Sequence, residues 1–140
     1  MTDPSDAEPE GRAAGIHQYQ LPGGWELLVG RTAAANDHLS LRLARPGDLW
    51  FHVRAMPGSH VILRVPAGAA PDRSTQELAA AIAAYHSKAR SGGTVAVSCT
   101  EARHVSKPPR APAGTVTIRK ERVLKVQPID ESTLATLRVD

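Results

Sequence analysis

The sequence between Leu49 and Val65 constrains the fold more than any other stretch of the chain. Side chains alternate between the two faces of a β-strand. On both sides of Pro57-Gly58 the odd-numbered residues are apolar, namely Leu49, Phe51, Val53, Val61, Leu63 and Val65. Proline followed by glycine favours a type II turn, in which the glycine takes a positive φ. The pattern therefore predicts a β-hairpin of strands 49–54 and 60–65 with one face in the hydrophobic core.

The other face of the same hairpin has a different composition. Its even-numbered residues are Trp50, His52, Arg54, His60, Ile62 and Arg64. An aromatic ring can stack on a nucleobase, and a cationic side chain can hold a phosphate. We therefore expect this face to point away from the core and to bind nucleic acid. The alternative is that a helix covers this face and buries Trp50.

The clearest helix follows the hairpin, at about residues 75–91. Ser74 and Glu77 have the spacing of a capping box. Apolar residues then recur at intervals of three and four, which places Leu78, Ile82, Tyr85 and Ala89 on one face. Gly92 suits the left-handed position that commonly ends a helix.

The remaining pattern predicts the other elements of a small sheet. Apolar, β-branched runs indicate strands at 25–30, 94–100, 114–120 and 123–127, with Glu121 and Arg122 linking the last two. A short helix near 33–44 would be capped by Asn36. Together these elements predict a single α+β domain with a mostly antiparallel sheet and one main packed helix. The domain would span 16–128, after an acidic, disordered tail (1–15) and before a short C-terminal tail or helix (129–140).

The distribution of charge favours an anionic partner. The chain carries a formal net charge of +3, but residues 1–15 hold −3 and residues 128–140 hold −2, which leaves +8 on the 112 residues between them. Within 103–125, seven Lys and Arg residues stand against the single acid Glu121. A basic body between acidic ends is typical of nucleic-acid binding, although a generally solvated surface explains the charge equally well.

Motifs of common catalytic centres are missing from the sequence. It shows no nucleophile elbow, phosphate-binding glycine loop or dinucleotide fingerprint. Its six histidines show no pair at the spacing of a zinc site. We therefore expect a non-catalytic protein with no cofactor and no resident metal. The main alternative is a metal-dependent hydrolase or nuclease that uses Asp37, Asp48, His52 and His60.

Several blocks of this sequence resemble one known family. They are "VGRTAAANDHLSLRLARPGDLWFHVRAMPGSHVIL" (29–63), "AAIAAYHSKARSGGTVAVSCT", "HVSKPP" and "GTVTIRKERVLKVQP". They are similar to the NFACT-R domain, the RNA-binding module of the NFACT proteins of ribosome quality control. The likeness covers about residues 24–128, and it is to the free-standing version of the domain. Thr32 and Ala35 stand where the family usually has Asn and Gln.

The resemblance implies an RNA-binding domain, and the residue pattern supplies candidates for the contacts. Phosphates would be neutralised by Arg31, Arg54, Lys107, Arg110, Arg119, Lys120 and Arg122. Stacking and hydrogen bonds would come from Trp50, His52 and His60. Asn36, Asp37 and Ser59 complete the set. Each also has another interpretation: Asn36 could cap a helix, and Ser59 could bond to the turn backbone. Asp37 could be a surface carboxylate, or it could orient Arg31 or a histidine.

The partner we expect is RNA, with tRNA, rRNA or the ribosome as possibilities. DNA or a ribosomal protein are the alternatives that the same basic face allows. No apolar run approaches the roughly 18 residues of a membrane span, and the first residues lack a basic-then-apolar leader. We therefore expect a soluble, cytoplasmic protein with no membrane partner.

Overall fold

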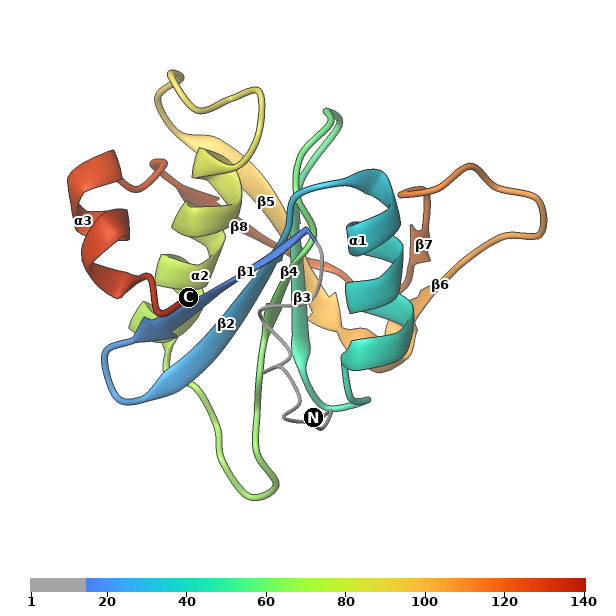
Figure 1. The fold of residues 1–140 in the computed structure, drawn as a ribbon, viewed down its shortest axis with the longest axis horizontal. Helices are drawn as coiled ribbons and strands as arrows, with labels where there is room; N and C mark the ends of the chain where they lie inside the picture. The colour runs from blue at the N-terminus through green and yellow to red at the C-terminus, as the bar shows by residue number, and fades with distance from the viewer. Residues whose placement is uncertain (1–14) are drawn as a thin grey trace, which may run out of the picture.

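The computed structural model describes residues 15–140, and a six-stranded antiparallel sheet is at its centre (Figure 1). In spatial order β1-β2-β4-β3-β5-β8 the strands are Ile16–Leu21, Trp25–Gly30, Val61–Leu63, Leu49–Val53, Val95–Glu101 and Arg122–Val126. The short strands β6 (Val105–Ser106) and β7 (Thr117–Ile118) pair separately. The α+β class with a mostly antiparallel sheet is confirmed.

One face of the sheet packs on the main helix, α2 (Arg73–Tyr85). The odd-numbered hairpin residues Phe51, Val53, Val61 and Leu63 are buried there against the alanines and Ile82 of α2. Trp50 pairs with Ile62 across the hairpin, so the odd and even residues are segregated as the alternation predicts. The odd face is therefore the main hydrophobic core, and this prediction is confirmed.

The other face is not open, and here the prediction is wrong. Helix α1 (Ala33–His38) and the π-helical segment Leu39–Leu43 lie against it. They enclose a second apolar cluster in which Leu28, Leu39, Trp50 and Ile62 are buried. The physical reason is that α1 and the π-helical segment bring their own apolar side chains, which need a partner face on the sheet.

Helix α2 ends six residues before its predicted end. Its first turn is capped by Asp72, whose carboxylate accepts from the amide of Thr75, rather than by Ser74. After Tyr85 the backbone turns to the hairpin, where the His86 carbonyl accepts from the amide of Ser59 at 2.9 Å. The hydroxyl of Ser87 donates to the Ala84 carbonyl and accepts from the Ala89 amide. These bonds replace the next helical turn.

The hairpin turn also departs from the predicted type. Its positive φ belongs to Ala55 (63°), whereas Gly58 is not among the glycines with positive φ. Gly58 is required for a different reason, because a Cβ there would lie 3.0 Å from the Cβ of Ser87. The glycine thus permits close approach of the hairpin to the end of α2.

The ends of the chain add a strand that was not predicted and a helix in segment 129–140, where a tail or a helix was expected. Strand β1 was not predicted, and it extends the sheet beyond β2. The segment predicted as a strand at 114–120 forms only β7, which pairs with β6 rather than with β8. A helix, α3 (Glu131–Leu137), lies beside β1. Residues 1–14, where we expect disorder, lie outside the described part of the chain. In residues 15–140, no helix has the length and apolar character needed to cross a membrane.

Candidate nucleic-acid interface

The even face of the hairpin is sealed by hydrogen bonds as well as by packing. Trp50 is only 3% exposed, and its indole N–H donates to the hydroxyl oxygen of Ser40 at 2.9 Å. The Ser40 hydroxyl is in turn 2.8 Å from Nδ1 of the buried His60. The prediction that Trp50 and His60 face a nucleobase is therefore wrong. Both side chains attach the π-helical segment to the sheet.

Asn36 belongs to the same buried network. Its side-chain oxygen accepts from the backbone amide of His60 at 3.0 Å. It also packs on Gly30, where an added Cβ would lie 2.1 Å from that oxygen. Thr32 rather than Asn36 caps α1, through a bond from the Ala35 amide. Asn36 therefore fixes α1 to strand β2 and to the hairpin.

Arg64, another cation of the even face, forms its bonds inside the protein. Arg64 is 5% exposed and forms an ion pair with Asp48 at 3.1 Å. Asp48 also accepts from the amides of Arg45 and Val65. These bonds fully occupy the carboxylate in holding the π-helical segment, the loop after it and β4 together.

His52 is less deeply buried than His60 and lines an open surface groove. Its ring stacks on Trp50 with the centroids 5.8 Å apart, and it meets His60 edge-on at 5.4 Å. Burial lowers the pKa of His52, and burial together with the charge of His52 lowers the pKa of His60 to about 4. At neutral pH both rings are therefore uncharged.

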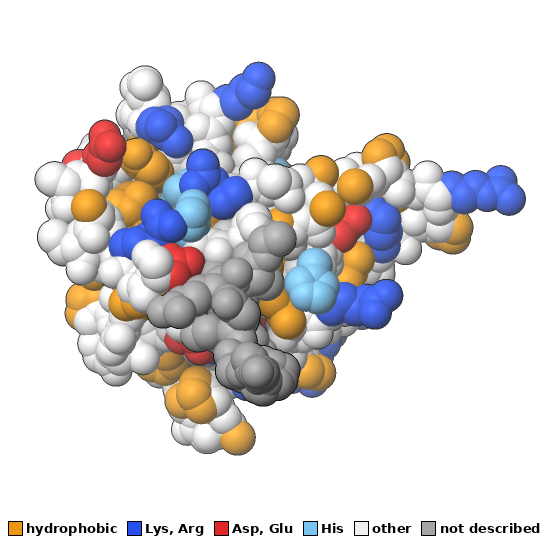
Figure 2. Space-filling view, viewed as in Figure 1, with side chains coloured by type: hydrophobic (Ala, Val, Ile, Leu, Met, Phe, Trp, Pro, Cys, Tyr) orange, Lys and Arg blue, Asp and Glu red, His pale blue; other side chains and the backbone are white. Residues whose placement is uncertain are grey.

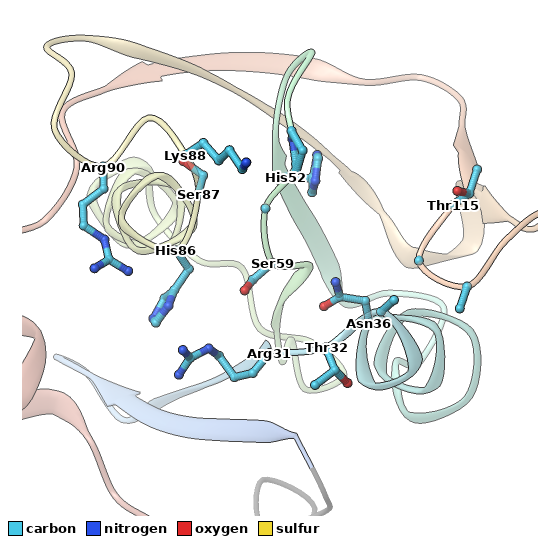
Figure 3. A pocket seen from close by; sticks show the side chains of 15 residues that line it. Arg31, Thr32, Asn36, His52, Ser59, His86, Ser87, Lys88, Arg90 and Thr115 are labelled. Atoms are coloured by element: carbon cyan, nitrogen blue, oxygen red, sulfur yellow. The ribbon is translucent and has the colours of Figure 1, made fainter.

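An open groove lies beside the sealed face, between the start of α1 and the end of α2 (Figure 3). Its volume is about 610 Å³. One wall is formed by Arg31 and Thr32, and the opposite wall by the turn from His86 to Arg90. Ser59 and His52 line the groove between the two walls. We call this hollow the α1–α2 groove.

The α1–α2 groove is basic. Arg31, Lys88 and Arg90 line it, and no acidic side chain of residues 15–140 does. In residues 15–140, none of these three forms an ion pair. On the face shown in Figure 2, Lys and Arg side chains gather around a histidine.

The pKa of His86 is lowered by its burial and by the positive charges around the groove. Burial lowers its pKa to about 3, and the charges of Arg31, Arg90, His17 and Arg138 add to the effect. Its Nε2 lies 3.3 Å from the hydroxyl of Tyr19. A cluster of cations around an uncharged imidazole is a site where an added anion is electrostatically favoured.

The far wall of the groove is a loop held by Asp37 and Lys107. The Asp37 carboxylate accepts from the amide of Gly114 at 3.0 Å and pairs with the Lys107 ammonium at 3.1 Å. Lys107 also donates to the carbonyls of Pro112 and Thr115. Both side chains are therefore occupied in fixing this loop against α1. Asp37 orients neither Arg31 nor a histidine through any hydrogen bond or ion pair among the described residues.

The other predicted cations are dispersed. Arg54 has a side chain that is 51% exposed, and Glu121 lies 3.6 Å from it. Arg122 donates to Gln76 of α2, on the opposite side of the sheet from α1. Arg110, Arg119 and Lys120 are exposed, and none of them lines the groove. Of the seven cations chosen from sequence, only Arg31 lines the groove, and RNA contacts by the others stay predictions.

Lys88 and Arg90 fall within the helix that the sequence predicts at about 75–91. They line the groove because α2 ends at Tyr85. His86 and Ser87 were missed for the same reason. The signal that could have found them is Ser87, since its side chain competes for backbone bonds and favours the end of a helix.

The residues of the alternative hydrolase do not form a metal centre. Across residues 15–140, no three His, Cys, Asp or Glu side chains are grouped so that they could hold a metal ion. Asp48 is bonded to Arg64, and Asp37 to Lys107 and Gly114, as described above. The fold and the groove together define a small α+β module with a basic surface suited to polyanions.

The chain belongs to the NFACT protein RNA binding domain family, whose model matches residues 16–120. It is 38% identical over 123 residues to the Rqc2 homolog RqcH of Bacillus subtilis (strain 168), a match that covers 88% of this chain and 21% of that protein. The corresponding protein of Streptococcus suis (strain 05ZYH33) is 37% identical, with 83% and 22% covered. The chain thus spans about a fifth of the length of these curated relatives.

A solved structure supports the same assignment. The C-terminal part of the fibronectin/fibrinogen-binding protein from Streptococcus suis superposes with a TM-score of 0.83 at 33% identity. The match covers 95% of this chain and 53% of that chain. The family resemblance seen in the sequence is therefore confirmed.

Proposed function

We propose that this domain binds single-stranded RNA in the α1–α2 groove, without catalysing a reaction on it. The observation that carries the proposal is the set of three cations, Arg31, Lys88 and Arg90, in a groove that no acidic side chain of the described residues lines. Within residues 15–140 these three cations form no ion pair, and the Arg90 Nε–H donates to the Tyr85 carbonyl at 2.8 Å while its two terminal amino groups can still donate. They are therefore available to phosphates at little cost, whereas Arg64 or Lys107 would first have to break existing ion pairs.

The polar residues of the groove support contacts beyond charge. Thr32 and Ser59 line the groove with hydroxyl groups that can donate to a ligand, whereas the Ser87 hydroxyl already bonds to Ala84 and Ala89. His52 presents an imidazole at the same surface. Unpaired bases expose hydrogen-bonding edges and stacking faces, which such groups can contact. This composition favours a single strand over a duplex, whose base edges are occupied in pairing.

Fluorescence anisotropy with an unstructured RNA tests the proposal. The double variant Arg31→Ala, Arg90→Ala should lose roughly 100-fold in affinity, because two charge-assisted contacts disappear. The control variant Arg73→Ala, Lys125→Ala removes the same charge from exposed positions that do not line the groove. It should stay within about threefold of wild type, because salt screens distant charges. Equal losses in both variants would show that the groove is not the binding surface.

The relatives suggest where such binding would be used. Since the chain covers about a fifth of the RqcH proteins, a role in ribosome quality control, with tRNA or ribosome-associated RNA as ligand and in the cytoplasm, is our proposal. Competition with single-stranded DNA of the same sequence tests the polymer, because only RNA offers a 2′-hydroxyl. Equal affinity for both would show that binding does not use the 2′-hydroxyl.

A further inference from the structure

A second hollow opens from the α1–α2 groove toward helix α3. Its volume is about 410 Å³, and we call it the α3 pocket. It shares Arg31, His86 and Arg90 with the groove, so the two hollows are continuous. In Figure 3 these three side chains lie on the side of the groove next to α3, and Thr115 lies on the opposite side.

Helix α3 closes the far side of this pocket. Leu134 is buried in the main core, in the same cluster as Tyr19. The backbone is fixed before and after the helix, since the Ile129 amide donates to Ala81 and the Val139 amide to Gln18. A strand that enters the groove beside Thr115 and runs past His86 therefore meets a wall. This geometry suits the end of a chain rather than its interior.

The lining of the α3 pocket combines aromatic, apolar and charged groups. Tyr85 supplies a ring, over which the Arg90 guanidinium lies at 4.1 Å from the centroid. Leu134 and Ala135 supply apolar surface from α3, and Glu131 supplies a carboxylate that can accept from a base N–H group, such as N3–H of uracil. Arg138 is paired with Asp140 at 2.5 Å, so a phosphate at the mouth would depend on Arg31 and Arg90.

We propose that the α3 pocket holds the terminal nucleoside of an RNA strand whose phosphates lie in the α1–α2 groove. The domain then distinguishes a free RNA end from the interior of a strand. The base stacks beside Tyr85, and the last phosphate lies between Arg31 and Arg90. This inference rests on the proposed function, and it adds a site made partly by α3, which lies beyond the family match of residues 16–120.

Linear and circularised oligouridine of the same length, each labelled internally, test the inference with the full chain. Wild type should bind the linear form roughly tenfold more tightly, the contribution of one stacked base. Ala135→Trp fills the pocket and should lower the affinity for linear RNA to that for the circle. The control is Thr136→Trp, which lies on α3 outside both hollows and should keep the preference. Linear forms with a phosphate at the 5′ end, at the 3′ end or at neither show which end enters.

The outcomes separate this inference from the proposed function. Wild type that binds linear and circular RNA equally overturns the end pocket and leaves the groove intact. Wild type that binds neither overturns the proposed function itself. Ala135→Trp that weakens both forms to the same extent shows a continuous path rather than an end site, which also overturns the inference. If that variant does not fold, Tyr85→Leu removes the ring without filling the pocket and should abolish the same preference.

Discussion

Helix α1 separates two surfaces, one that the sequence marks as a candidate RNA site and one that it does not. On its covered side lie Trp50, His60 and Asn36, joined to Ser40 in a buried network. On its open side lies the α1–α2 groove with its three cations. The first surface has the aromatic and polar residues expected of an RNA site, yet all of them are used internally. The second has few distinctive residues, yet its charges are available.

Residue type alone therefore does not identify a binding surface. A polar side chain is available to a ligand only if the fold leaves it without an internal partner. In this domain the "DLWFHV" and "PGSHV" blocks build the support for α1, and α1 in turn positions Arg31 at the groove. These blocks therefore act on binding through the position of α1 rather than through contact.

The largest expected effect is the loss of stability when Trp50 is removed from the covered surface. Trp50→Ala should lower the free energy of unfolding by about 3–5 kcal/mol, because it empties a filled site in the second core. The affinity of the folded variant for RNA should fall far less than that of Arg31→Ala, Arg90→Ala, since Trp50 acts on binding only through the position of α1. Urea denaturation and anisotropy at low temperature measure the two quantities.

A milder substitution covers the case in which that variant does not fold. Trp50→Phe keeps most of the volume and loses the bond to Ser40, which should cost about 1 kcal/mol. Its RNA affinity should be unchanged. A large loss of affinity with little loss of stability would show that Trp50 contacts RNA, contrary to its place on the covered surface.

Acid should destabilise the covered surface. The folded-state pKa of His60 is lowered to about 4 from the ordinary 6.5. Between these two values the unfolded chain binds the proton more readily, so stability is full above pH 6.5 and falls as the pH drops toward 4. The loss from His60 should reach about 3 kcal/mol. Urea denaturation from pH 7 to pH 4 measures the combined loss from His60, His52 and His86, whose pKa values are all lowered. An NMR titration midpoint near 6.5 for His60 would contradict its share of the loss.

The smallest expected effect concerns the basic segment outside the groove. Arg110→Gln combined with Arg119→Gln removes two exposed cations that line neither hollow. Affinity for RNA should fall by no more than about threefold at physiological salt, because charges beyond a Debye length are screened. A loss as large as that of Arg31→Ala, Arg90→Ala would show that RNA binds at the 103–125 segment instead of the groove.

The sequence predicted what depends on local pattern. The odd face of the hairpin, strand β2 and the existence of α2 follow from alternation, turn residues and helical spacing. The burial of Trp50 could not be predicted this way, because alternation shows which residues share a face and not what covers it. The covering helix was itself expected, near 33–44, but its position on the sheet depends on long-range contacts such as that from Asn36 to His60.

The candidate groove was unpredictable for a related reason. The start of α1 and the turn after α2 are more than fifty residues apart in the sequence, and only the sheet brings them together. The end of α2 is set by its bonds to the hairpin rather than by Gly92. Helical spacing through Ala89 continued past that point, so the pattern alone extended the helix too far.

The salt dependence of RNA binding tests most directly whether Arg31, Lys88 and Arg90 hold the RNA phosphates. Each cation that contacts a phosphate of a single strand contributes roughly −0.7 to the slope of log affinity against log salt. Three groove cations predict a slope of about −2 for wild type, and Arg31→Ala, Arg90→Ala should reduce it to about −0.7. A wild-type slope near −5, the value for the seven cations chosen from the sequence, or a slope that the double variant leaves unchanged, would contradict the account.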